Sequence, residues 1–109
     1  MIERVKKENI CLECCPTSNL LLAYCHDLRT HPVRSLLRQG VQVSISPDDP
    51  GFFGNPGVTL DYLVAYVAWG LDLADLKKLA LNSLEHSAIS QEDKAEILSF
   101  FNYAWTKFL

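Results

Sequence analysis

The chain has 109 residues, of which 49% are hydrophobic and 21% are charged, and its formal net charge is −3. These proportions are typical of a globular protein and exclude a disordered one, and the length allows a single domain. The slight excess of acidic groups argues against a nucleic-acid partner. No apolar run reaches the roughly 18–20 residues that span a bilayer, so no membrane partner is expected. The charged start of the chain lacks the apolar segment of a secretory signal, which makes the cytoplasm the default location.

A strand is expected over residues 10–15, after a short polar helix over residues 2–8, and it carries three of the four cysteines. Cys11 and Cys14 have the spacing C-x-x-C, but on a strand they point to opposite faces. No second pair of this kind exists, and the fourth cysteine is Cys25. We therefore interpret the cysteines as small buried hydrophobic residues and not as a zinc or redox site.

A turn is expected over residues 16–19 and a helical turn or two over residues 20–24. The next predicted elements are a helix and a second strand. Pro32 suits the first turn of a helix that ends at Gly40, and His31 stands at the capping position. Residues 41–46 alternate between apolar and small polar side chains, which predicts a half-buried strand. Residues 47–58 contain three prolines and three glycines and are expected to form a loop.

Three helices are predicted in the second half of the chain, with Thr59, Asp72 and Ser90 as their capping residues. Their expected buried faces are Leu60, Leu63, Val64, Val67, Ala68 and Leu71 in the first, Leu73, Leu76, Leu79 and Ala80 in the second, and Ile97, Phe101, Ala104 and Phe108 in the third. The order strand, helix, strand predicts parallel strands in an α/β fold. Because two strands are too few for a covered parallel sheet, we expect part of a larger α/β protein or a chain that associates.

Two adjacent carboxylates, Asp48 and Asp49, are the first candidates for chemistry. They follow the second predicted strand, and active sites of parallel α/β folds are built at that end of the strands. Adjacent carboxylates repel each other, which a divalent cation or a hydrogen-bond donor would relieve. The alternative is a simple turn that caps a helix, because prolines flank the pair.

Glu13 is the second candidate, because a carboxylate within an apolar strand needs a partner. It is either hydrogen-bonded for structural reasons or part of a site at the strand end. The three histidines, His26, His31 and His86, form no metal-binding pattern, so we expect capping or solvated roles for them.

Two motifs, C-P-T-S-N at residues 15–19 and S-P-D-D-P at residues 46–50, make the chain resemble the adenosine/AMP deaminase family. The similarity is greatest to the growth-factor-related adenosine deaminases, within the metal-dependent amidohydrolase superfamily. Residues 27–33 and 81–87 also match that branch, and the resemblance extends over nearly the whole chain.

The resemblance implies that residues 1–109 form one unit, the last two βα units and terminal helices of a (βα)8 TIM-type barrel. The strands at 10–15 and 41–46 would then be the seventh and eighth. It further implies that Asp48 is a zinc ligand and that Asp49 binds the purine, with Glu13 in the active-site region. The reaction it implies is the zinc-dependent hydrolysis of adenosine to inosine and ammonia.

The chain lacks other residues that the family uses, namely the H-x-H pair, a third zinc histidine, the general-acid Glu and the catalytic His. A catalytic zinc needs roughly three protein ligands, so the chain alone is not expected to be active. Its expected partners are a purine nucleoside in the complete enzyme, and either the missing amino-terminal part of the barrel or further copies of itself. The alternative is a non-catalytic remnant that acts as an oligomeric or interaction module. A secreted parent protein and a cytoplasmic one are both compatible with the resemblance.

Overall fold

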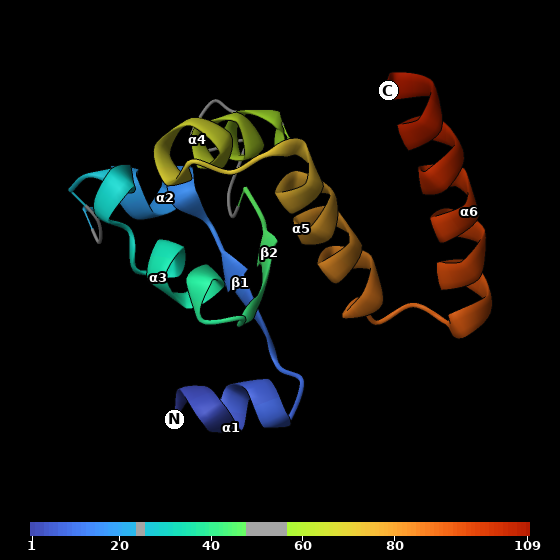
Figure 1. Ribbon diagram of the computed structural model, residues 1–109, viewed down its shortest axis with the longest axis horizontal. Coiled ribbons are helices and arrows are strands. Elements are labelled where there is room, and N and C mark those ends of the chain that lie inside the picture. Colours follow the sequence, from blue (N-terminus) through green and yellow to red (C-terminus); the bar gives the residue numbers. More distant parts are fainter. Residues whose placement is uncertain (24–25, 48–56) are drawn as a thin grey trace.

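The structure, a computed structural model, describes residues 1–23, 26–47 and 57–109. Its elements are α1 (Ile2–Lys7), β1 (Cys11–Cys14), α2 (Pro16–Leu21), the 3-10 turn η1 (Leu28–Thr30), α3 (Pro32–Arg38), β2 (Gln42–Ile45), α4 (Thr59–Trp69), α5 (Leu73–Glu85) and α6 (Gln91–Phe108). Their order along the chain is the predicted one (Figure 1). Helix α2 begins at Pro16, within the stretch 16–19 that was expected to form a turn, and it includes Leu20 and Leu21 of the expected helical turn over residues 20–24.

The two strands pair in parallel, as the sequence predicts. Cys11 lies opposite Gln42 and Cys14 lies opposite Ile45. The peptide N–H of Ser46 donates to the carbonyl oxygen of Cys14 at 2.9 Å, so the ladder continues one residue beyond β2. In a parallel ladder every second residue turns both backbone groups toward the partner strand. Val43 therefore directs its carbonyl group to the edge of β2 that lies away from β1.

The core lies against one face of the sheet. Alternate residues of the second strand segment are buried there, and three helices supply the side chains that cover them. The buried apolar residues are Cys14, Val33, Val41, Val43, Ile45, Ala65, Trp69 and Leu79. The opposite face carries the partly exposed side chains of Gln42 and Ser44, so the predicted alternation of β2 is confirmed.

The buried face of α4 differs from the expected one. Leu63 and Val67 are 57% and 72% exposed, whereas Asp61, Ala65 and Trp69 are buried. The indole N–H of Trp69 donates to the carbonyl oxygen of Leu28 at 2.8 Å, which turns this side of the helix toward η1. Because α4 is apolar around most of its circumference, its periodicity could not show which side the fold would cover.

The helix ends follow the predicted signals in all but one case. Gly70 ends α4 in the left-handed conformation at a φ of 65°, which glycine adopts without strain. Asp72 and Asp75 form a reciprocal capping box at the start of α5. The hydroxyl of Ser90 accepts the N–H of Asp93 at 3.1 Å at the start of α6. Thr59 does not cap α4, because Val58 occupies the capping position and makes no side-chain hydrogen bond.

The last helix, α6, stands apart from the sheet and meets the rest of the fold along α5 (Figure 1). None of its residues is buried, so the predicted burial of its apolar face is wrong for this chain by itself. The radius of gyration is 14.4 Å, above the roughly 13 Å of a compact domain of about 100 residues. The chain therefore exposes apolar side chains along a long helix, among them Phe100 and Phe108.

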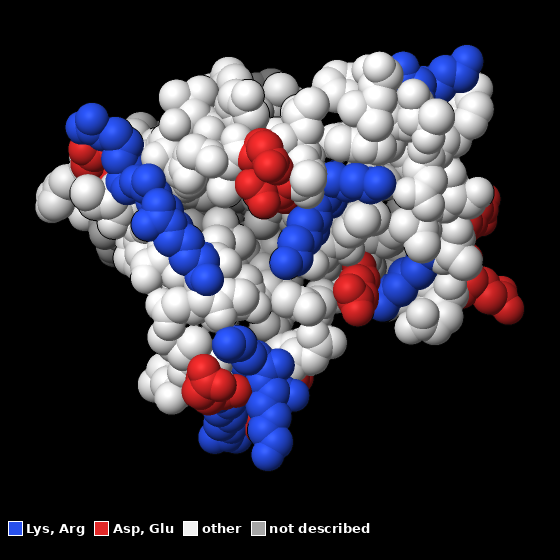
Figure 2. Space-filling model, in the orientation of Figure 1, with Lys and Arg blue, Asp and Glu red and all other residues white. Residues whose placement is uncertain are grey.

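No helix in the described ranges combines the length and the apolar character that a membrane crossing requires. Charged side chains are dispersed over the face shown in Figure 2, with blue and red groups close together over α1. Arg4 pairs with Glu8 there, and Lys6 pairs with Glu3. Exposed pairs of this kind contribute little to stability.

Candidate functional site

The carboxyl ends of β1 and β2 lie side by side and create the edge at which chemistry was predicted. The hydrogen bond from Ser46 to Cys14 holds the two chain segments together at the point where they leave the sheet. One segment continues through Cys15 into α2, and the other continues through Pro47 toward residues 48–56. Residues that follow the two strands therefore start from one shared edge.

Asp48 and Asp49 lie outside the residues that the structure describes. Ser46 and Pro47 are the last described residues before them, and both are partly exposed. The roles of the two aspartates therefore remain predictions, which rest on their place in the sequence directly after this edge.

Glu13 lies on the polar face of the sheet, opposite Ser44, and its side chain is exposed. The thiol of Cys11 lies on the same face. Burial raises the pKa of this thiol, and the charges of Glu85 and Glu13 act in the same direction, against a hydrogen bond with Ser44. A thiol whose pKa is raised stays protonated at neutral pH and is a poor metal ligand or nucleophile. The polar face therefore offers one exposed carboxylate and no activated cysteine at this position.

His31 is engaged in structural contacts. Its Nδ1 accepts the N–H of Val33 at 3.1 Å, and its Nε2 lies 2.7 Å from Oδ1 of Asn19. Because Nδ1 accepts, the proton of the neutral ring resides on Nε2 and is donated to Asn19. Burial lowers the pKa of His31, which favours this neutral form. The predicted capping role is therefore confirmed.

His86 lies at the end of α5 and bridges it to the start of β1. Its Nδ1 lies 3.1 Å from the carbonyl oxygen of Asn82, and its Nε2 lies 3.2 Å from that of Asn9. The described part of the chain holds no group of three or more His, Cys, Asp or Glu side chains that could bind a metal. Because His31 and His86 are engaged in these contacts, and the exposed His26 has no such group beside it among the described residues, these residues by themselves do not fit a zinc centre.

Two buried polar residues near the strands were missed by the sequence analysis. Asp61 on α4 is 0% exposed, and its Oδ1 accepts the backbone N–H of Thr17 at 3.0 Å. Asn82 on α5 is 7% exposed, and its Nδ2 donates to the carbonyl oxygen of Val43 at 3.0 Å. The available signal was a short polar side chain within an apolar helix, which usually marks a tertiary hydrogen bond when it is buried.

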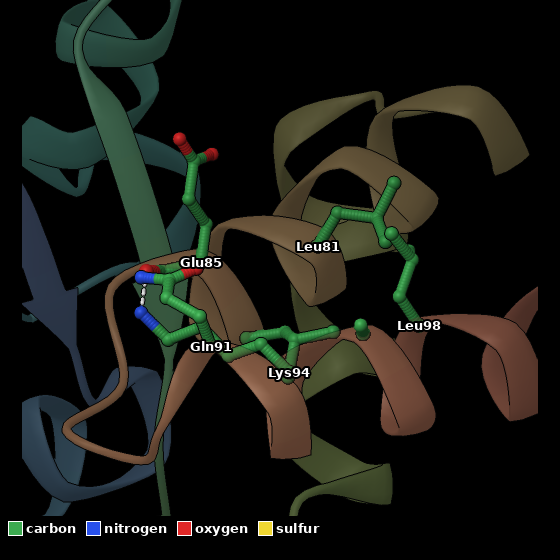
Figure 3. Close-up of a pocket in the computed structure, with 7 residues that line it drawn as sticks. Leu81, Glu85, Gln91, Lys94 and Leu98 are labelled. Atoms are coloured by element: carbon green, nitrogen blue, oxygen red, sulfur yellow. Dashed lines mark hydrogen bonds between the residues drawn. The ribbon is translucent and has the colours of Figure 1, made fainter.

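A groove away from the strand ends lies between α5 and α6 (Figure 3). It measures about 430 Å³ and is lined mainly by leucine and alanine side chains, among them Leu81 and Leu98. Lys94 closes one part of it by donating to the carbonyl oxygen of Glu85 at 2.7 Å. Its lining offers no cluster of catalytic groups, so we place the candidate site at the strand ends and not in this groove.

Comparison with known proteins gives the family. The family model described as adenosine deaminase matches residues 1–103. This chain belongs to the adenosine deaminase family. The resemblance that the sequence motifs indicate is thereby confirmed.

The similar proteins described next are named either adenosine deaminase 2 or adenine deaminase. Adenosine deaminase 2 of Dictyostelium discoideum is 38% identical over 110 residues, which is 100% of this chain and 20% of that protein. Adenosine deaminase 2 of Homo sapiens is 37% identical over 106 residues, which is 94% of this chain and 21% of that protein. Adenine deaminase of Acinetobacter baylyi is 42% identical over 104 residues, which is 94% of this chain and 30% of that protein.

Two solved structures of deaminases superpose on this chain. Adenine deaminase from Arthrobacter aurescens superposes with a TM-score of 0.85 at 29% identity, over 97% of this chain and 32% of that chain. The apo N6-methyl-AMP deaminase from Arabidopsis thaliana superposes with a TM-score of 0.86 at 22% identity, over 96% of this chain and 31% of that chain, which shows a shared fold alone. The chain therefore spans less than a third of the length of these relatives, and it is a helix-rich α/β fragment of a deaminase fold.

Proposed function

We propose that the chain is the carboxyl-terminal segment of a zinc-dependent deaminase that hydrolyses the amino group of adenosine or a related adenine compound. In this proposal residues 1–109 are one unit and provide the last two βα units of the barrel. The remainder of the barrel, which this chain does not contain, supplies the other zinc ligands, the general-acid Glu and the catalytic His. The chain is not competent alone.

The observation that carries the proposal is the shared edge of the parallel strands. The two strands that precede the motifs C-P-T-S-N and S-P-D-D-P end side by side, joined by the hydrogen bond from Ser46 to Cys14. Active sites of parallel α/β barrels lie at this edge. We propose that Asp48 binds zinc there, that Asp49 contacts the purine, and that Glu13 belongs to the same region.

Completion of a barrel also accounts for the surfaces that this chain leaves open. In the part of the chain that the structure describes, no strand pairs with the edge of β1 away from β2. Helices α4 and α6 also expose apolar side chains, and proteins normally cover both kinds of surface. Exposed apolar residues there include Leu63, Val67 and Phe100. Covering by the amino-terminal part of the barrel favours the enzymatic proposal, whereas covering by further copies of this chain favours the alternative, a non-catalytic oligomeric module.

A completed barrel tests the proposal. Residues 1–109 replace the matched region of the Acinetobacter baylyi adenine deaminase, and the chimera is assayed on adenine and adenosine, with its metal content measured. We expect Asp48→Ala to abolish activity and to lower the zinc content, because it removes a metal ligand. We expect Asp49→Ala to keep zinc and to lower kcat/KM, because it removes a contact to the purine.

The matched control is Asp93→Ala, which alters an exposed carboxylate on α6 far from the strand ends. It should keep both zinc and turnover. Near-normal zinc content and turnover in both the Asp48 and the Asp49 variants would contradict the proposed roles. A well-folded chimera without deaminase activity would favour the non-catalytic alternative.

A further inference from the structure

Arg34 and Arg38 lie one turn apart on α3, and neither pairs with a carboxylate in the part of the chain that the structure describes. The basic groups that form ion pairs there are Arg4, Lys6 and Arg29. Like charges four positions apart on a helix repel each other. The chain has a net charge of −3, yet this side of α3 carries two adjacent positive charges that no described side chain neutralises.

Two open hollows have these arginines in their lining. The first measures about 300 Å³, lies between η1 and α3, and also includes Arg29, Thr30 and Ser35 in its wall. The second measures about 280 Å³ and extends toward the turn between α4 and α5. Among the charges shown in Figure 2, basic side chains form a row over η1 and α3. An anion that enters either hollow therefore meets positive charge.

The guanidinium groups of both arginines have N–H donors available. Nη1 of Arg34 donates to the carbonyl oxygen of Arg29 at the long distance of 3.4 Å, and its buried Nε has no hydrogen-bond partner among the described residues. An unpaired buried donor is rare in native proteins and requires an explanation. Arg38 makes no hydrogen bond within the described ranges. The contacts of the two side chains within this chain therefore do not account for them.

The carboxylates nearest to this surface are engaged elsewhere. Asp75 lines the second hollow, but its Oδ2 accepts the N–H of Asp72 at 2.9 Å in the capping box of α5. Asp27 pairs with Arg29, with 2.7 Å between Oδ2 and Nη2. The charge of Arg29 is thus neutralised, and the uncompensated charge of the first hollow belongs to Arg34 and Arg38.

We propose that Arg34 and Arg38 bind the phosphate group of a small molecule. Two guanidinium groups match a dianion, and a phosphate group carries about −1.5 to −2 charges at pH 7, whereas a carboxylate provides a single charge. The planar fork of arginine donates two parallel hydrogen bonds to phosphate oxygens. The hydroxyl of Ser35 lines the same hollow and can donate a further one. This site uses none of the residues of the candidate active site, so it does not depend on the proposed function.

Calorimetric titration with inorganic phosphate at constant ionic strength tests the site, both in the 109-residue chain and in the completed barrel. We expect one saturable site per chain. Arg34→Gln and Arg38→Gln should each raise the Kd for phosphate by roughly 10- to 100-fold, because each removes hydrogen bonds to a charged group. The matched control is Arg4→Gln, which removes the same charge from the exposed surface of α1 and should change the Kd by less than about 2-fold.

Titration with adenosine monophosphate, and with adenosine as the ligand without a phosphate group, identifies the form of phosphate that is bound. Tighter binding of the monophosphate than of inorganic phosphate would support a phosphate ester, and the reverse would support free phosphate. Adenosine binding should not respond to Arg34→Gln or Arg38→Gln.

Amide hydrogen exchange on the same proteins provides a second readout. Phosphate should slow the exchange of residues 29–38 in the unaltered protein and in Arg4→Gln, but not in Arg34→Gln or Arg38→Gln. The proposal would be overturned by the absence of saturable phosphate binding in both proteins, or by an equal rise of the Kd in Arg4→Gln.

Discussion

The imidazole of His31 contacts four elements of the fold at once. It caps α3 through Val33, donates to Asn19 of α2, lies 3.9 Å from the sulfur of Cys14 in β1, and its ring centroid is 5.6 Å from that of Trp69 in α4. The contact with Val33 requires a ring whose Nδ1 is unprotonated, and hence a neutral ring. Protonation would remove the acceptor of the Val33 N–H, so we expect this residue to couple stability to pH.

Stability is predicted to fall on acidification through His31. Burial lowers its folded-state pKa below the ordinary value of 6.5, so the unfolded chain binds the proton more readily. The contribution of neutral His31 to the free energy of unfolding is complete above pH 6.5, and it is lost as the pH falls toward the folded-state pKa. Urea unfolding at about pH 7.5 and about pH 5.5, a window above most carboxylate titrations, measures this loss.

The matched variant for this measurement is His31→Asn, because asparagine caps a helix without titrating. It should show a smaller loss of unfolding free energy between the two pH values than the unaltered chain. An equal loss in both proteins would assign the pH dependence to another group.

At the scale of an element, a side chain of α5 protects the edge of β2 that faces away from β1. The carbonyl group of Val43 points away from β1, and Asn82 reaches from α5 to donate to it at 3.0 Å. An unpaired backbone group at a sheet edge is both a loss of free energy and a template for association. Helix α5 therefore protects part of the strand that leads to Asp48.

Replacement of Asn82 by alanine is predicted to destabilise the chain by about 1–3 kcal/mol, because it leaves a buried carbonyl group without its donor. Urea unfolding measures this change. The control is Asn102→Ala on the exposed surface of α6, which should change the unfolding free energy by less than about 0.5 kcal/mol. Similar values for the two variants would show that the contact to Val43 contributes nothing specific.

At the scale of the whole molecule, the open surfaces and the incomplete ligand set lead to two expectations for the chain by itself. The sheet has two strands in the part of the chain that the structure describes, and a sheet of that size is marginal alone. Exposed apolar side chains cover α6, including Phe100 and Phe108 at 71% and 67%. The incomplete set of zinc ligands in this chain limits metal binding in the same way.

We expect the isolated chain to form homo-oligomers or a loosely packed helical monomer, because these surfaces need cover. Light scattering should then report a mass above 12.3 kDa, or else dye binding and poorly dispersed amide signals should mark the loose monomer. A monodisperse monomer with sharp, dispersed signals and a cooperative melt would contradict both forms.

Zinc binding by the isolated chain should be no stronger than that of a surface pair of carboxylates, because Asp48 provides one ligand where roughly three are needed. Titration calorimetry measures the affinity. Sub-micromolar binding that disappears in Asp48→Ala would show that the chain assembles a zinc site by itself, and Asp93→Ala is the control for an exposed carboxylate.

Local signals in the sequence were sufficient for most of the elements and for the family. Proline and glycine positions, capping residues and the alternation of residues 41–46 depend on neighbours within a few positions, so they can be read without a fold. The motifs around Cys15 and Asp48 are equally local, and they identified the adenosine deaminase family that the comparison confirms. The order strand, helix, strand also predicted that the two strands are parallel, as the structure shows.

Only the tertiary structure decided which sides of the helices and strands pack against each other. The sequence shows that α4 is apolar, but packing against α2 and η1 selects the side with Asp61 and Trp69 and leaves Leu63 and Val67 exposed. The hydrogen bonds from Thr17 to Asp61 and from Asn82 to Val43 join residues 44 and 39 positions apart. Such contacts depend on long-range geometry, which periodicity and propensity do not encode.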